Sequence, residues 1–349
     1  MTPEPHGSVE APVVPAAPVT NVTLGTRRPE KELLGATRPF IAESTARSWA
    51  YVGSTILVLA ALVAGAVLAP WVALKLVFSV LAGLTVVRMF CLFHDFYHGA
   101  LLRQSTLADG LFTLFGFAIL VPPSVWKETH NYHHAHTAKI VGSHIGSYPV
   151  VTVAMWKTMS GTQKTLYRLA RHPLNMFFAL FTVFFIGMCI RPFARAPKKH
   201  LGGLLAIVMV AAGSAALIGT GHVDAWVFGW LIPAWVATMA GAYLFYAQHN
   251  FPDALIADRQ SWTFANAALD SSSYFKMSPV MHWFTANIGY HHVHHLNAAI
   301  PFYRLPEAMA GVPELQHPGE TSWAPSEIMK NFRLKLWDTE QNTMVGYPD

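Results

Sequence analysis

The chain has 349 residues, of which 53% are hydrophobic and only 12% are charged. A net charge of +5 is compatible with nucleic-acid binding, but Lys and Arg cluster beside apolar runs and form no basic stripe interleaved with exposed aromatic residues. The two cysteines, Cys91 and Cys189, lie inside apolar segments, which excludes a disulfide framework and a thiolate zinc site. The composition therefore favours an integral membrane protein without a nucleic-acid partner.

The start of the chain is rich in Pro, Ala and Val and shows no helical or strand periodicity. It also lacks the order of basic, apolar and small residues that is typical of a signal peptide. We therefore predict a flexible N-terminal tail over residues 1–42, a membrane domain over 43–335 and a C-terminal tail over 336–349.

Four apolar runs are each close to the length that crosses roughly 30 Å of hydrocarbon. They cover residues 49–69, 71–93, 201–218 and 225–247. Short connections join the first to the second and the third to the fourth, so each pair is predicted to form a helical hairpin. The predicted fold class is an all-α integral membrane protein with four transmembrane helices in two hairpins.

The distribution of Lys and Arg predicts the orientation. The segment before the second hairpin and the N-terminal region are basic, whereas the turn inside that hairpin carries neither residue type. Both termini are therefore expected on the cytoplasmic side, in what we expect to be a bacterial cytoplasmic membrane. The shorter runs 107–122 and 174–190 are predicted to be interfacial or re-entrant helices, because this keeps every histidine cluster in one cytoplasmic cap.

Half of the 18 histidines are candidate ligands, and these nine lie in the four strings "HDFYH", "HNYHH", "QHN" and "HHVHH". Residues three and four apart share a face of a helix, so each of the three larger boxes directs imidazoles to a common point. This spacing is typical of metal ligands. The nine candidates are His94, His98, His130, His133, His134, His249, His291, His294 and His295.

The other histidines are weaker candidates. His292 points away from its neighbours in the third box, and His136 lies two residues past the second, so both are expected to support ligands or face solvent. His282 is a closer candidate, one helical stretch upstream of the third box. Isolated histidines near membrane helices are more often hydrogen-bonded side chains than ligands. This applies to His144, His172, His200, His222 and His317.

The type of ligand narrows the choice of metal. Imidazole suits Zn, Cu, Fe and Ni, and nine candidates are too many for one ion, so two ions are expected. The Glu-x-x-His spacing of soluble diiron bundles occurs only at Glu314 and His317, and the H-E-x-x-H motif of zinc proteases is absent. A histidine-rich, carboxylate-poor pair of irons is the remaining interpretation.

The ordered strings "HDFYHGAL", "WKETHNYHHAHT", "FYAQHNF" and "TANIGYHHVHHLNAAIPFYRL" resemble the membrane fatty acid desaturases, especially the acyl-lipid Δ12 (ω-6) type, over about residues 48–308. The resemblance implies a non-haem diiron centre bound by the nine histidines, and it supports His249, which no local spacing supports. One position departs from a related pattern. Animal acyl-CoA desaturases have an Asn four residues before that histidine, and this chain has Phe245, so Gln248, Asn250 or solvent is the alternative ligand.

The resemblance further implies an O₂-dependent enzyme that introduces a cis double bond into a fatty acyl chain, and we expect this chain to belong to a membrane lipid. About thirty residues follow "HPGE" at 317–320, too few for a fused cytochrome domain, so we expect a separate ferredoxin, flavodoxin or cytochrome b5 type electron donor. Its docking surface, or alternatively a surface facing anionic lipid, is predicted at Lys127, Lys139, Lys157 and Lys164.

Partners for the second nitrogen of each imidazole are also expected. The candidates are Asp95, Glu128, Asp270 and Asn287. Asp95 ranks lower than the others, because it directly follows His94 and neighbouring residues of a helix point in different directions.

Two other functions remain open on the sequence. A hydroxylase or ketolase of the same architecture, acting on an alkane, sterol or carotenoid, would share the histidine boxes and differ in its product. A histidine-rich metal transporter is the alternative of another class. It would place ionisable residues in the middle of the spans, whereas runs 49–69 and 201–218 contain none.

Overall fold

The computed structural model describes residues 27–140, 145–258 and 260–348, and this part of the chain is mostly helical. Within it, four helices are long and apolar enough to cross a membrane. They are α2 (Thr45–Leu68), α3 (Val72–Tyr97), α10 (Leu201–Gly219) and a continuous segment made of α11 (Val223–Trp226), the π-helical η3 (Val227–Leu231) and α12 (Ile232–Ala247). The four spans predicted from the sequence are therefore confirmed.

The spans differ in how deeply they are buried within the protein. About 61% of the apolar window of α3 is buried, against 17% for α2 and 11% for α10. Helix α3 packs against both α2 and α12. Gly83 makes the second contact possible, because a Cβ at this position would lie 2.7 Å from Cβ of Val236. Helix α3 is thus the central span, while α2 and α10 present most of their apolar surface outward, as lipid-facing helices do.

Helices α4 (Thr106–Ala118) and α5 (Pro123–His136) meet at an angle of 91°. The bend follows from the sequence, because Pro122 and Pro123 supply no backbone N–H and restrict the residues before them. The chain turns tightly through Leu120, whose φ is +60°, and the amide of Val121 donates to the Gly116 carbonyl at 2.7 Å. The bend ends the apolar run and directs the polar, histidine-bearing α5 back into the protein.

A second set of helices precedes α10. It consists of α6 (Val153–Thr158), α7 (Gly161–Ala170), α8 (Pro173–Phe177), the π-helical η2 (Leu180–Ile190) and α9 (Arg191–Arg195). Segment η2 packs against α10 and α12. That runs 107–122 and 174–190 stay on one side of the membrane remains a prediction.

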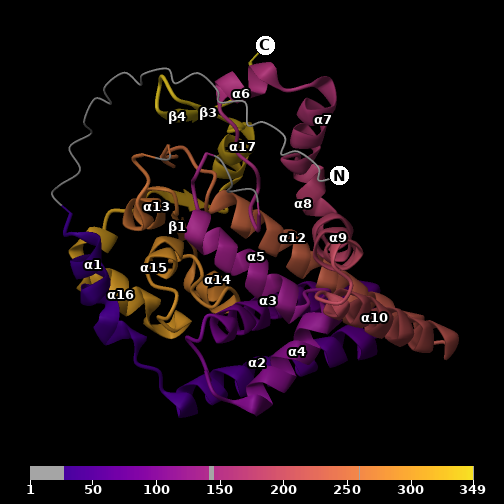
Figure 1. The fold of residues 1–349 in the computed structure, drawn as a ribbon. Helices are drawn as coiled ribbons and strands as arrows, with labels where there is room; N and C mark the ends of the chain where they lie inside the picture. The colour runs from indigo at the N-terminus through magenta and orange to yellow at the C-terminus, as the bar shows by residue number, and fades with distance from the viewer. Residues whose placement is uncertain (1–26, 141–144, 259, 349) are drawn as a thin grey trace, which may run out of the picture.

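The remaining elements form a cap over the ends of α3 and α12. Figure 1 shows α10 extending towards the lower right and the elements from α13 to α16 gathered at the left. The cap contains α13 (Phe264–Asp270), α14 (Pro279–Phe284), α15 (His291–Leu296), η4 (Phe302–Arg304), α16 (Leu305–Gly311), η5 (Pro313–Leu315) and α17 (Pro325–Arg333). Strand β1 (Tyr274–Lys276) pairs in parallel with β2 (Glu320–Ser322), and β3 (Leu336–Asp338) pairs antiparallel with β4 (Thr343–Val345), so the protein is not purely α-helical.

Ordered elements lie outside the predicted domain limits of 43 and 335. Helix α1 (Glu30–Thr37) and η1 (Arg38–Ile41) precede the first span, and the side chain of Leu33 is fully buried. Arg27 pairs with Asp270 at 2.5 Å and thereby ties this segment to α13. At the other end, Trp337 of β3 is 2% exposed. These segments are short, and distant residues hold them in place, so local periodicity did not reveal them; residues 1–26 of the predicted tail lie outside the described part of the chain.

Candidate metal centre

The structure brings all nine candidate histidines into two adjacent groups. In each group, one nitrogen from every histidine lies within 4.8 Å of the corresponding nitrogen of every other member. The five-histidine group is His94, His98, His130, His134 and His294. The four-histidine group is His133, His249, His291 and His295.

The five-histidine group combines three elements. His94 lies in the last turn of α3 and His98 directly follows this helix, while α5 and α15 supply the other members. The Nε2 atom of His134 lies 3.1 Å from Nε2 of His130 and 3.1 Å from Nε2 of His294. The group thus joins the end of the central span to α5 and the cap.

The four-histidine group is built around His249, which follows α12 by two residues. Its Nε2 atom lies 2.9 Å from Nε2 of His291 and 3.1 Å from Nε2 of His133. His295 completes the group, with its Nε2 atom 3.1 Å from that of His291. The isolated histidine of the sequence therefore lies at the centre of a cluster.

These nitrogen separations fit a metal site. Two ligands at right angles around one ion lie about 3 Å apart when the metal–nitrogen bonds are about 2.1 Å long. The Nε2 pairs of both groups are 2.9 to 3.1 Å apart. In addition, Nε2 of His98 is buried without a hydrogen-bond partner, an arrangement that a polar group adopts rarely unless an ion satisfies it.

The electrostatics also suit a metal. Burial lowers the pKa of the His249 imidazole to about 4, and it lowers the pKa values of His291, His294 and His295 well below the usual range. Neighbouring imidazoles add to the shift in the last three. The rings are therefore neutral at physiological pH, and each keeps the lone pair that a metal requires.

Asp95 contacts the five-histidine group, contrary to its low rank in the sequence analysis. One carboxylate oxygen lies 3.1 Å from Nδ1 of His94, and the other accepts the backbone N–H of Phe302 at 2.8 Å. The argument from helical direction was wrong here because Nδ1 lies on the backbone side of the ring, within reach of a short neighbouring carboxylate. Asp95 thus orients His94 and ties it to η4.

The other three predicted partners lie elsewhere. Glu128 pairs with Lys199 at 2.7 Å, and Asp270 pairs with Arg27. Asn287 donates to the carbonyl of Phe302 at 3.1 Å. These side chains therefore connect segments of the cap and its surroundings. These hydrogen bonds and ion pairs join them to residues other than the histidines of the two groups.

Three groups that contact the candidate histidines were not predicted from the sequence. The Thr137 hydroxyl donates to the carbonyl of His133 at 2.7 Å and lies 3.5 Å from Nδ1 of His295. Trp126 stacks on His130 with ring centroids 4.5 Å apart. Both lie four residues from a box histidine on the same helix face, a spacing that indicates contact. The third partner, the Ser271 carbonyl 2.9 Å from Nδ1 of His249, is a backbone group that no sequence pattern marks.

The remaining histidines lie outside both groups. His292 is fully buried, with Nε2 3.0 Å from the Leu315 carbonyl, and His136 stacks on Tyr132. His282 lies 3.5 Å from the Tyr274 hydroxyl. His172, His200, His222 and His317 belong to neither group, and His144 lies outside the described residues.

Phe245 lies four residues before His249 and borders the four-histidine group. Its ring lies 4.8 Å from the ring of His133 and 5.8 Å from that of His249, measured between centroids. The two polar alternatives are engaged elsewhere: Gln248 donates to the Ile288 carbonyl, and Asn250 donates to the Asn331 carbonyl. An apolar ring therefore borders the four-histidine group on this side.

Two cavities border the histidines. A cavity of about 440 Å³ lies between α3, α5, η2 and α12, and His130 and Trp126 form part of its wall. The rest of its lining is mainly apolar, with Val86, Phe90, Phe184, Met188 and Ala237 as examples. Its volume is in the range of small-molecule binding sites.

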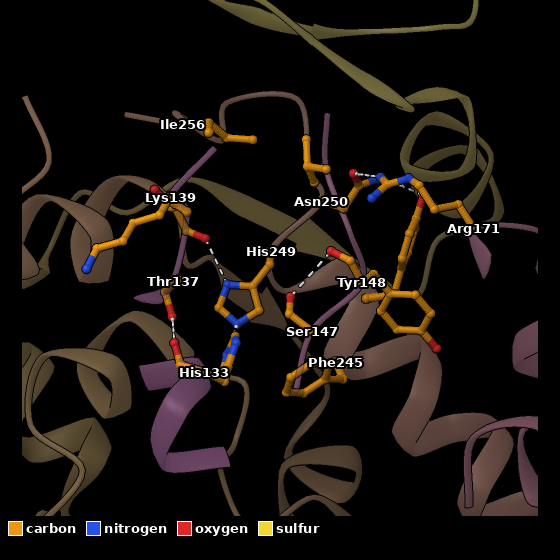
Figure 2. A pocket seen from close by; sticks show the side chains of 14 residues that line it. His133, Thr137, Lys139, Ser147, Tyr148, Arg171, Phe245, His249, Asn250 and Ile256 are labelled. Carbon is orange, nitrogen blue, oxygen red and sulfur yellow. Dashed lines mark hydrogen bonds between the residues drawn. The ribbon is translucent and has the colours of Figure 1, made fainter. Parts of the chain in front are cut away.

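The second cavity is a pocket of about 30 Å³ beside the four-histidine group. Figure 2 shows His133 and His249 facing each other at its wall, while the side chain of Lys139 extends away from them. Ser147, Arg171 and Asn250 also line this pocket, so it is more polar than the large cavity.

The four apolar spans and the two buried imidazole clusters define a helical membrane protein whose histidine groups are consistent with a metal site of the desaturase type. Comparison with known proteins agrees with this class, because residues 70–325 match the family model described as "Fatty acid desaturase". The match covers more than half of the chain, which therefore belongs to the fatty acid desaturase family, a family of oxidoreductases.

Several curated relatives are similar over most of their length. The chain is 28% identical over 283 residues to a "Fatty acid desaturase" of Bacillus subtilis, covering 78% of each chain. It is 24% identical over 302 residues to an "sn-1 oleoyl-lipid 12-desaturase" of Synechocystis, covering 84% of this chain and 82% of the relative. An "sn-1 acyl-lipid omega-3 desaturase (ferredoxin)" of the same organism is 25% identical over 257 residues, with 68% and 66% covered.

Proposed function

We propose that this membrane desaturase uses two non-haem irons, one in each histidine group, to introduce a cis double bond into the fatty acyl chain of a membrane lipid. The observation that carries the proposal is the division of nine imidazoles into groups of five and four, with the nitrogen separations expected around a metal ion. The proposed ligands are His94, His98, His130, His134 and His294 for one iron, and His133, His249, His291 and His295 for the other.

The large cavity is the proposed site of the acyl chain. Val86 and Phe90 of α3, Phe184 of η2 and Ala237 of α12 give it apolar walls, and these walls favour a hydrocarbon over water. His130 belongs both to the cavity wall and to the five-histidine group. A chain in this cavity would therefore run past the metal centre.

The chemistry divides between the metal and the protein. Bound and reduced, the two irons would supply O₂ activation and an oxidant able to remove hydrogen from an unactivated C–H bond. The protein holds the methylene groups in register along the cavity and excludes water from the apolar walls. Asp95 fixes the ring of His94, and the Ser271 carbonyl fixes that of His249, so both imidazoles present Nε2 to the centre.

The reaction requires two electrons from outside the chain. We propose a separate one-electron donor of the ferredoxin, flavodoxin or cytochrome b5 type, and the name of the Synechocystis omega-3 relative supports the first of these. Lys127, Lys139, Lys157 and Lys164 are the proposed docking residues for an acidic donor.

Lipid profiling tests the proposed function. A host that expresses the chain is expected to accumulate a new cis-unsaturated fatty acyl group in its membrane lipids, detected by mass spectrometry of derivatised fatty acids. The purified protein is expected to contain close to one iron per histidine group. Hydroxylated or ketonic products in place of a double bond would instead support the hydroxylase or ketolase alternative, and protein without bound iron would contradict the diiron assignment.

The proposed topology has its own test. The histidine groups and both termini are proposed to lie on the cytoplasmic side, and runs 107–122 and 174–190 are proposed not to cross the membrane. Single cysteines introduced at Lys127 and Glu320 should react from the cytoplasmic side with a membrane-impermeant maleimide, whereas one at Thr220 should react from the opposite side. Labelling of all three from one side would contradict the proposed arrangement.

A further inference from the structure

The two cavities beside the metal centre share part of their lining. Ser147, Tyr148 and Phe245 border both the apolar cavity of about 440 Å³ and the polar pocket of about 30 Å³. The cavities therefore approach each other across these residues. Phe245 is the one among them that also packs against both histidine groups.

The position of the Phe245 ring is defined by three contacts. Its centroid lies 4.8 Å from that of His133 and 5.8 Å from that of His249 in the four-histidine group, and 6.3 Å from that of His130 in the five-histidine group. Figure 2 shows Phe245 next to His133 at the edge of the pocket. The ring therefore lies where the polar pocket, the acyl cavity and the metal centre meet.

The two cavities suit different contents. The pocket has the volume for at least one water molecule, which needs roughly 10–15 Å³, and Ser147, Arg171 and Asn250 line it with polar groups. The apolar walls of the larger cavity favour hydrocarbon. An aromatic ring carries no group that relays a proton, so it is a suitable barrier between such spaces.

We propose that Phe245 is the partition that keeps water of the polar pocket away from the acyl cavity, and that it thereby couples O₂ consumption to double-bond formation. This inference rests on the proposed function. In the coupled reaction, O₂, two electrons from the external donor protein, two protons and a saturated –CH₂–CH₂– unit give a –CH=CH– unit and two molecules of water. In the uncoupled reaction, the same two electrons and two protons reduce O₂ to hydrogen peroxide, and the acyl chain is unchanged.

The test compares two phenylalanine truncations. Phe245→Ala removes the ring that both cavities share, whereas Phe184→Ala removes a ring that lines the acyl cavity alone. Each purified, iron-loaded variant is supplied with a reduced [2Fe–2S] ferredoxin and lipid, and peroxide and double bonds are measured per O₂ consumed. Phe245→Ala is expected to raise the peroxide yield several-fold and to lower double bonds per O₂ in proportion. Phe184→Ala is expected to keep the wild-type ratio even where its turnover changes.

A measurement without metal separates this inference from the proposed function. A fatty acid with a polarity-sensitive fluorophore in the middle of its chain is bound to the iron-free protein. Its emission should shift to the red in Phe245→Ala and remain in place in Phe184→Ala, and Phe245→Leu should give an intermediate value. Equal peroxide yields or equal emission in the two alanine variants would overturn the partition. A wild-type protein that makes no double bonds would overturn the proposed function, while the emission measurement would still test the partition.

Discussion

The two histidine groups lie side by side but differ in their surroundings. The five-histidine group takes two members from the end of the central span α3, contacts the Asp95 carboxylate and shares His130 with the apolar cavity. The four-histidine group borders the polar pocket through His133 and His249, and its partners are the uncharged Ser271 carbonyl and Thr137 hydroxyl. The difference supports the proposal that the acyl chain binds on the side of the five-histidine group, while the four-histidine group borders the polar pocket.

The helical spacing of the boxes explains how two groups arise from the same helices. In α5, His130 and His134 are four residues apart and enter the five-histidine group, whereas His133 enters the other. In α15 the assignment is reversed, because His291 and His295 enter the four-histidine group and His294 enters the five-histidine group. Each of these two boxes thus contributes an i, i+4 pair to one group and a single histidine on the adjacent face to the other, whereas the first box contributes only the pair His94 and His98 to the five-histidine group.

The largest loss of activity is expected from substitution of His249. Its Nε2 atom lies close to Nε2 of both His133 and His291, at the centre of the four-histidine group. His249→Ala should abolish desaturation and lower the iron content, because the remaining three imidazoles of this group lose their common neighbour. The control is His222→Ala, since His222 lies before α11 and contacts the Thr220 hydroxyl instead. Iron analysis and lipid profiling measure both effects. Equal behaviour of the two variants would remove His249 from the site.

Substitution of Asp95 tests whether iron binding by the five-histidine group depends on the Asp95 carboxylate. Asp95→Asn keeps the shape of the side chain but removes the charge, and its amide cannot accept from both His94 and the Phe302 N–H as the two carboxylate oxygens do. Loss of such a partner typically costs about 10- to 100-fold in metal affinity or activity.

The matched control for Asp95→Asn is Glu128→Gln, a carboxylate that pairs with Lys199 at the surface. Iron affinity measured by competition with a chelator should fall for Asp95→Asn and stay near the wild-type value for Glu128→Gln. An unchanged iron affinity in Asp95→Asn would show that the carboxylate is dispensable for the five-histidine group.

Local patterns in the sequence predicted the spans and the eight candidate histidines of the three boxes, whereas His249 was supported only by the resemblance to the desaturases. Apolar runs such as 71–93 and the three- and four-residue spacing of the boxes are local patterns, and local patterns determine helix length and helix face. The structure brings the nine predicted histidines together, although their role as iron ligands remains a proposal.

Features that depend on distant residues were not predictable in this way. The partner of His249 is a backbone carbonyl at Ser271, and the boundary between the two cavities is formed by Phe245 together with the distant residues Ser147 and Tyr148. The burial of Leu33 and Trp337 likewise depends on the packing of the whole cap. Asp95 shows the opposite case, because a local rule about helix faces gave the wrong result where Nδ1 of His94 lies within reach of the neighbouring carboxylate.

Substitution of Gly241 tests whether the acyl chain binds in the cavity of about 440 Å³. Gly241 lines the cavity, and a Cβ at this position would meet no atom within 4 Å, so Gly241→Leu should fill the cavity without displacing the backbone. Misplacement of a substrate by about 1 Å can cost up to a hundredfold in rate, so we expect a loss on the order of tenfold with long acyl chains and a smaller loss with shorter ones.

The control for Gly241→Leu is Gly213→Leu in α10, where a Cβ also meets open space but does not line the cavity. Thermal unfolding and iron content should stay near wild type in both variants, and turnover should fall in Gly241→Leu alone. An unchanged preference for chain length in Gly241→Leu would mean that the acyl chain binds elsewhere.

The smallest effect is expected at Thr137, the uncharged counterpart of Asp95 in the other group. Its hydroxyl donates to the His133 carbonyl at 2.7 Å and lies 3.5 Å from Nδ1 of His295, so Thr137→Val removes both contacts while it keeps the shape of the side chain. A neutral hydrogen bond contributes about 0.5–1.5 kcal/mol, which corresponds to a roughly two- to tenfold change in iron affinity. Thr137→Ser, which retains the hydroxyl, should restore the wild-type affinity in the same chelator competition. If Thr137→Val weakened iron binding as much as Asp95→Asn, iron binding would not depend on the difference between the carboxylate beside the five-histidine group and the uncharged partners of the four-histidine group.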